Sequence, residues 1–236
     1  MTPLEVAVHV PDGFLDAPTS VTTGVAAAAV VGASLVRAAR HELDDRTAPL
    51  AGLVAVFVFA AQMVNFPVGA GTSGHLLGAA LAAVLVGPAT ATLCLTVVLA
   101  VQAFLFADGG VTALGTNVLL MGTVAVWVGY LVARGVLALL PRRPASIPAA
   151  AACGALVSVP VAALAFVGLY ALGGAAPIPL DQLAGAMVGW HVLIGIGEAV
   201  ITFLAVSSIV AARPDLVHAA RGRLPELTLK TPEPVA

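Results

Sequence analysis

Three histidines in this sequence are placed where they could act on a transition-metal ion. His9 lies near the N-terminus, His75 ends the segment GTSGH, and His191 opens the segment HVLIGIGE. Neutral imidazole is a ligand that nickel, cobalt, copper and zinc favour. The remaining two, His41 and His218, lie in charged segments, where we expect solvated side chains. Metal capture by His9 and His75 is the chemistry these positions indicate, although a purely structural role stays open for each residue taken alone.

Further polar residues are predicted to orient such ligands by hydrogen bonds, as the outer partners of metal-bound histidines commonly do. These candidates are Asp12, Asn65, Ser73, Asp108, His191 and Glu198. Glu198 follows His191 by two helical turns, so both are expected on one side of a helix. An ionisable residue within an apolar segment usually faces a cavity or a neighbouring helix.

Composition indicates that these residues belong to a membrane protein. Of the 236 residues 60% are hydrophobic and only 9% are charged, whereas soluble domains carry about 25% charged residues. So apolar a chain has too little polar surface to cover a globule, and lipid is its natural solvent. The net charge of −2 excludes a basic surface for nucleic acid.

Seven apolar stretches are predicted to form transmembrane helices, which need about 20 residues each. The stretches are residues 21–36, 48–64, 75–87, 89–107, 115–140, 147–172 and 183–212. The third is short, and Gly87-Pro88 predicts a tight turn before the fourth. The predicted fold class is therefore an all-α integral membrane protein of about seven spans. It comprises an extracellular arm (1–20), a helical domain (21–212) and a loosely ordered, polar cytoplasmic tail (213–236).

The charges predict the orientation of these spans. With the N-terminus outside and the C-terminus in the cytoplasm, all ten Lys and Arg residues fall on the cytoplasmic side, as the positive-inside rule requires. The same orientation puts His9 and His75 at the outer face. A substrate would then be captured from outside.

Four segments in order resemble the CbiM/NikM family, the substrate-binding membrane subunits of energy-coupling-factor (ECF) transporters for cobalt and nickel. They are VHVPDGFLD (8–16), NFPVGAGTSGH (65–75), ADGGVTALGTN (107–117) and HVLIGIGEA (191–199). The resemblance runs from residue 8 to about residue 215. It implies a nitrogen-rich, near-planar site for Co²⁺ or Ni²⁺ as the transported substrate, with cobalt preferred. The donors it implies are the N-terminal amine, the backbone nitrogen and imidazole of the histidine that follows, and the histidine of GTSGH.

The same resemblance implies partners and a location. The partners are a transmembrane coupling protein, cytoplasmic ATPase subunits and a small accessory membrane protein. The location is the bacterial cytoplasmic membrane, and the imported metal would feed cobalamin synthesis or nickel enzymes. The sequence itself contains no GxxxxGK[ST] motif, and its only lysine is Lys230. We therefore expect a transporter subunit that is not an enzyme and binds no nucleotide by a P-loop.

The start of the chain departs from the family pattern, which begins Met-His. Here seven residues precede Val8. Either this extension is real, and His9 and His75 recruit other donors, or translation begins at Val8, read as Met from a GTG codon. Abundant Ala and Gly, and nine Arg against one Lys, indicate GC-rich coding and favour the second explanation. Val8 would then supply the terminal amine.

Two other functions compete with metal capture. Gly71-Thr72-Ser73-Gly74 matches the nucleophile motif of rhomboid-like intramembrane serine proteases, with His191 as the base. That interpretation leaves VHVPDGFLD unexplained. The second is a secondary transporter or channel working alone. Inverted repeats would favour it, and we find no convincing repeat in the sequence.

Overall fold

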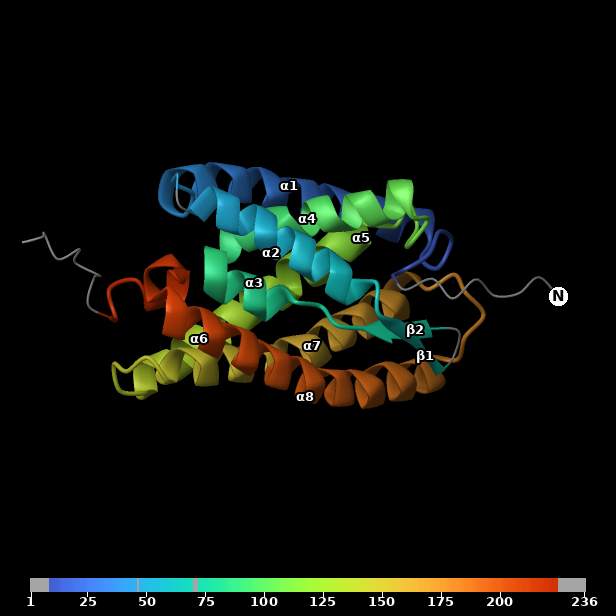
Figure 1. Ribbon diagram of the computed structural model, residues 1–236. Helices are drawn as coiled ribbons and strands as arrows, with labels where there is room; N and C mark the ends of the chain where they lie inside the picture. The colour runs from blue at the N-terminus through green and yellow to red at the C-terminus, as the bar shows by residue number, and fades with distance from the viewer. Residues whose placement is uncertain (1–8, 46, 70–71, 225–236) are drawn as a thin grey trace, which may run out of the picture.

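The structure is a computed structural model that describes residues 9–45, 47–69 and 72–224. Its helices lie side by side along one long axis (Figure 1). They are α1 (Ala17–His41), α2 (Thr47–Gln62), α3 (Ala79–Val86), α4 (Pro88–Leu105), α5 (Leu114–Asn117), the π-helical η1 (Val118–Ala125), α6 (Val126–Leu139), α7 (Ser146–Gly173) and α8 (Leu180–Ala212). Each predicted apolar stretch contains helix. The fifth stretch contains three consecutive elements, α5, η1 and α6, which together form one segment long enough to span a membrane, Leu114–Leu139.

The predicted all-α membrane class is confirmed. Five helical segments of the described chain are long and apolar enough to cross a membrane, and α2 is a shorter apolar helix. The third stretch forms only the eight-residue α3, which ends at Val86 just before Gly87, and α4 begins at Pro88 as expected. The number of segments that cross the bilayer, and their direction, remain predictions.

The short helix α3 lies in the middle of the bundle, and every one of its residues is buried. It contacts α2, α4, α6 and α7. Its alanines allow these neighbours to come close, because small side chains let helix backbones approach one another. A Cβ added at Gly129 of α6 would come within 2.8 Å of the Cβ of Ala80. The bundle is therefore packed around α3 with no room for larger side chains at this crossing.

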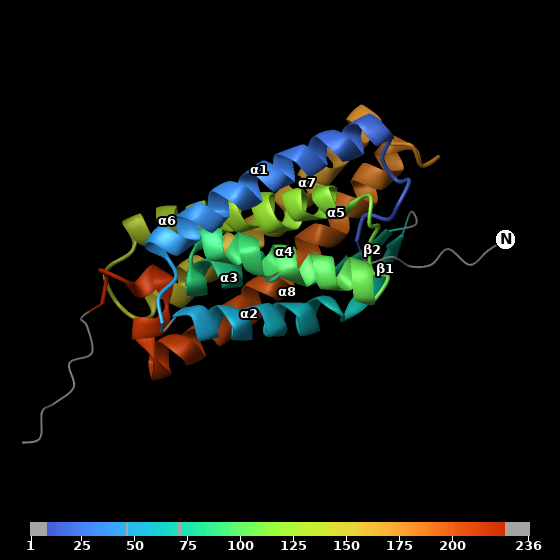
Figure 2. The ribbon, with the colours of Figure 1, turned by 90° about the horizontal axis from the view of Figure 1, so that it is seen from above.

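Two short strands, which the sequence analysis did not predict, connect α2 to α3. They are β1 (Asn65–Gly69) and β2 (Thr72–His75), paired antiparallel with Asn65 opposite His75. Figures 1 and 2 both place this hairpin at the end of the bundle where α1 begins. The N-terminal arm and the GTSGH segment therefore lie at the same end.

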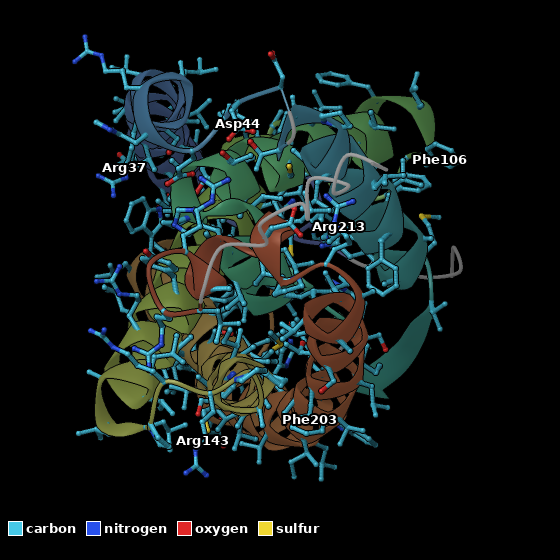
Figure 3. All side chains as sticks on the ribbon, turned by 60° about the vertical axis from the view of Figure 1, so that its left-hand side comes forward. Arg37, Asp44, Phe106, Arg143, Phe203 and Arg213 are labelled. Atoms are coloured by element: carbon cyan, nitrogen blue, oxygen red, sulfur yellow. The ribbon has the colours of Figure 1, made fainter. Side chains whose placement is uncertain are left out.

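The opposite end carries arginines and the folded beginning of the C-terminal tail. Figure 3 views this end, with Arg37, Arg143 and Arg213 on it. Here the expectation of a loosely ordered tail is wrong for residues 213–224. Two 3₁₀ turns, Pro214–Leu216 and His218–Ala220, follow α8. The second contacts α3. Val217, just before this turn, and Ala220, within it, are buried in the hydrophobic core.

His218 is likewise not solvated as expected. Its ring packs against Tyr130 at a centroid distance of 6.1 Å, and burial lowers its pKa. Residues 225–236 of the predicted tail lie outside the described residues.

Candidate metal centre

His9 opens a short arm that is fastened at its other end to α1 and α7. The ring of Phe14 packs on Phe166 and Tyr170 of α7, with centroid distances of 5.6 and 5.4 Å. Asp16 caps α1, because its Oδ1 accepts the Thr19 N–H at 2.9 Å. These contacts fix where the arm leaves the bundle and so limit where His9 can lie.

The loop between α4 and α5 holds the middle of the arm. The Gly110 N–H donates to the carbonyl oxygen of Val10 at 3.0 Å. On Asp12, Oδ1 accepts the N–H of Thr112 at 2.8 Å and also the Thr112 hydroxyl. These bonds stabilise the carboxylate, and the Thr112 hydroxyl chiefly holds the pKa of Asp12 below its usual value of 3.8. Asp12, in the first of the four segments, is thus hydrogen-bonded to ADGGVTALGTN, another of them.

Glycine is required where this loop meets the arm. Gly109 has a φ of +91°, and a Cβ there would lie 2.8 Å from the Cβ of His9. A Cβ on Gly110 would lie 2.3 Å from the Asp12 nitrogen. Only a residue without a Cβ therefore permits the close approach that places His9.

The arm brings the imidazoles of His9 and His75 together. Their ring centroids lie 4.7 Å apart in an edge-to-face arrangement, and both residues are only 5% exposed. His9 Nδ1 lies 3.3 Å from Oδ1 of Asp108, but neither ring nitrogen of His9 has a hydrogen-bond partner within the described residues. Buried polar atoms are nearly always satisfied in native proteins. Two ring nitrogens without a hydrogen bond in the described residues, one facing the Asp108 carboxylate and the other beside a second imidazole, therefore fit a ligand such as a metal ion.

His75 is arranged to offer its other ring nitrogen. Nδ1 lies 3.0 Å from the carbonyl oxygen of Leu76. A carbonyl only accepts, so Nδ1 carries the proton, and in the neutral ring Nε2 keeps its lone pair. His75 ends β2, and α3 begins only at Ala79. Burial, rather than a nearby helix start, disfavours the charged form of the ring.

His191 and Glu198 both point into the bundle from α8, as their spacing predicted. The Nδ1–H of His191 donates to the Met187 carbonyl at 2.7 Å. Glu198 bonds to the turn after His75: its Oε2 accepts the Leu77 N–H at 2.7 Å. Glu198 therefore holds the backbone of the segment that follows His75.

Of the predicted orienting residues, Asp12 lies on the arm, Asp108 lies beside His9, and Glu198 bonds to the segment after His75. Asn65 and Ser73 lie on the hairpin, but their side chains are outside the described part of the structure, as is Val8. Within the described residues, no group of three or more His, Cys, Asp and Glu side chains is arranged to hold a metal. Two residues absent from the predicted site, Asn117 and Gln62, bond to the backbone of Val10 and Leu77. In the sequence, the only indication of these two roles is an amide side chain at the end of an apolar helix.

Fold and site together define a helical, multi-pass membrane protein whose N-terminal arm closes over a pair of buried histidines. The chain belongs to the family described as "Cobalt uptake substrate-specific transmembrane region", whose sequence model matches residues 9–216. The predicted family is thereby confirmed.

Named relatives and solved structures agree with this assignment. The chain is 40% identical over 219 residues to a protein of Archaeoglobus fulgidus provisionally named fused nickel transport protein NikMN, covering 92% of this chain and 70% of that protein. It is 35% identical over 133 residues to the cobalt transport protein CbiM of Geobacter sulfurreducens, covering 55% and 38% respectively. A crystal structure titled as a truncated transition metal transporter matches with a TM-score of 0.80 at 33% identity, covering 86% of this chain and 99% of that one. These names confirm the expectation of a transport protein rather than an enzyme.

Proposed function

We propose that this chain is the substrate-capturing membrane subunit of an ATP-driven, ECF-type importer of cobalt or nickel. The observation that carries the proposal is the buried pair of imidazoles, in which both ring nitrogens of His9 lack a hydrogen-bond partner within the described residues. Nitrogen donors of this kind suit late first-row divalent metals and not Mg²⁺ or Ca²⁺. Relatives named for nickel and for cobalt support the same class of substrate.

The arm acts as the closing element of the proposed site. Backbone and side-chain hydrogen bonds hold it to the loop after α4, and these bonds fix the position of His9 next to His75. Both metals accept these donors, so the histidines do not distinguish cobalt from nickel. Because metal and protons compete for the same lone pairs, we expect affinity to fall at acid pH.

The remaining donors are proposed to come from the chain just before His9. If Val8 is the first residue of the mature protein, its amine and the His9 amide form chelate rings with the His9 imidazole. A tetragonal nitrogen field of that kind favours Ni(II) and accepts Co(II). Mass spectrometry of the native N-terminus tests this: a mature chain that starts at position 8, with Met in place of Val8, supports it, and one that retains Thr2–Val8 contradicts it.

Energy for import is proposed to come from partners. The sequence contains no P-loop motif, so a transmembrane coupling protein and cytoplasmic ATPases would drive transport across the cytoplasmic membrane, with a small accessory membrane protein. The supplied metal would serve cobalamin synthesis or nickel enzymes.

Uptake of radioactive cobalt or nickel by cells that express the chain with its partners tests this function. We expect ATP-dependent uptake that His75→Ala abolishes and His41→Ala, an exposed histidine at the other end of α1, leaves intact. Ser73→Ala separates transport from proteolysis: uptake should persist, whereas a serine protease would lose its activity. Uptake that survives His75→Ala would contradict the proposal.

A further inference from the structure

We infer that Glu198 is a positioning residue for the proposed metal ligand His75, and that it acts through the peptide group between Leu76 and Leu77. This inference rests on the proposed metal site. It assigns to the buried carboxylate of α8 a part in tuning a ligand that it does not touch.

The connection runs through a single peptide group. Its carbonyl oxygen, on Leu76, accepts the Nδ1–H of His75 at 3.0 Å. Its N–H, on Leu77, donates to Oε2 of Glu198 at 2.7 Å. The imidazole, the peptide group and the carboxylate thus form one continuous chain of hydrogen bonds that ends on the ring nitrogen opposite the metal-facing Nε2.

The next peptide group is fixed in the same manner. The Gly78 N–H donates to Oε1 of Glu198 at 3.0 Å, and the Leu77 carbonyl accepts from Nε2 of Gln62 at 2.9 Å. Glu198 is 2% exposed and Gln62 is fully buried. Both carboxylate oxygens are therefore used, and the Leu76–Leu77 and Leu77–Gly78 peptide planes cannot rotate without breaking buried hydrogen bonds.

This arrangement has a chemical consequence for His75. Metal-bound histidines commonly donate their second N–H to a carboxylate or carbonyl, which fixes the ring and raises the basicity of the ligating nitrogen. Hydrogen bonds in series polarise one another in a low-dielectric interior. A carboxylate on the Leu77 N–H makes the Leu76 carbonyl a stronger acceptor, so Nε2 of His75 becomes a stronger donor to the metal.

The chain contains a matched control for the structural part of this role. Glu42 is also a buried carboxylate that accepts two backbone N–H groups, those of Ala89 and Thr90 at the start of α4, at 3.2 and 2.7 Å. It is 3% exposed and lies 3.6 Å from Arg37, at the arginine-bearing end. Neither of these peptide groups is bonded to a histidine. Loss of Glu42 should therefore affect folding but not the metal.

The test compares Glu198→Gln, Glu198→Asp and Glu42→Gln in the full-length chain purified in detergent. The readouts are the Kd for Ni²⁺ and the energy of its visible d–d absorption, which reports donor strength. Gln offers one acceptor oxygen, and its amide nitrogen opposes the other N–H group. We expect Glu198→Gln to bind Ni²⁺ about 10- to 100-fold more weakly, as removal of an outer partner of a ligand typically does, with the d–d band at lower energy.

Glu198→Asp, which keeps the charge, should show smaller changes in the Kd for Ni²⁺ and in the energy of the d–d band. If Glu198→Gln does not fold, Glu198→Asp is compared with the wild type instead. Glu42→Gln should lower thermal stability and leave Kd and band unchanged. An unchanged band and Kd in both Glu198 variants, or equal losses in Glu42→Gln, would overturn the inference while the proposed function stands. A wild-type chain that binds no Ni²⁺ or Co²⁺ would overturn the proposed function and this inference together.

Discussion

Asn117 pairs with both backbone polar groups of Val10, the residue that follows His9. Its Oδ1 accepts the Val10 N–H at 3.0 Å, and its Nδ2 donates to the Val10 carbonyl at 3.2 Å. Asn117 is the last residue of α5 and is 3% exposed. The side chain thus substitutes for a strand partner and holds the arm against the bundle.

Asn117→Ala should weaken metal binding, because the arm loses two hydrogen bonds and the partly buried Val10 N–H is left unpaired. Such losses cost about 1–3 kcal/mol, which corresponds to a roughly 5- to 150-fold higher Kd. Isothermal titration with Ni²⁺ or Co²⁺ measures it. The control is Thr116→Val on the same helix, which removes a buried 2.7 Å hydrogen bond to Thr23 without touching the arm. A similar Kd in the wild type and Asn117→Ala would refute the clamping role.

Gly110→Ala should displace the arm by crowding. The added methyl group would lie 2.3 Å from the Asp12 nitrogen, and overpacking of this kind costs about 1–3 kcal/mol. We expect metal affinity to fall by at least about fivefold. Gly185→Ala is the matched control, because a Cβ there meets nothing within 4 Å. Equal affinities of the two variants would show that the close approach is not needed for binding.

Asp12→Ala tests the hydrogen bonds to Thr112 and their dependence on pH. These bonds lower the pKa of Asp12 below 3.8, so the docking contribution of the carboxylate is present above that value and is lost only as pH falls below it. Because Asp12 is exposed, we expect only about a threefold rise in Kd. Affinity of both proteins should fall toward about pH 5 as protons compete with metal. The ratio of the two Kd values should stay constant, and a ratio that collapses by about pH 5 would contradict this assignment.

The predicted orientation is tested by single cysteines in a background with Cys94 and Cys153 replaced by alanine. Val111→Cys lies beside Thr112 and is exposed at 49% in the native residue. Arg143→Cys lies at the arginine-bearing end (Figure 3). An impermeant thiol reagent added to intact cells should label the first and spare the second. The reverse pattern would place the arm in the cytosol and exclude capture from outside.

The sequence predicted those parts of the fold that depend on hydrophobic runs and on strong turn formers. The run of residues 89–107 and the Gly87-Pro88 turn reappear as α4 and its start, since lipid solvation and the missing proline N–H act locally. His191 and Glu198 share a buried helix side because helical period alone sets that relation.

The hairpin and the long-range hydrogen bonds of the site could not be predicted from local sequence patterns. The hairpin contains Pro67 and glycines, which are unfavourable in strands, and its pairing depends on the elements around it. Glu198, Gln62 and Asn117 bond to backbone groups far away in sequence, and backbone groups are the same at every residue. The contact of the turn His218–Ala220 with α3 depends on a surface that only the assembled bundle presents.

Metal content of the purified chain with its natural start tests the paired-histidine site most directly. The wild type, His9→Ala, His75→Ala and the exposed control His41→Ala are each loaded with Ni²⁺ or Co²⁺, freed of excess metal and measured by elemental analysis. The account predicts about one metal per chain in the wild type and in His41→Ala, because imidazole nitrogens of His9 and His75 hold the ion, and loss of metal from the other two variants. Stoichiometric metal retained by His9→Ala or His75→Ala would contradict it.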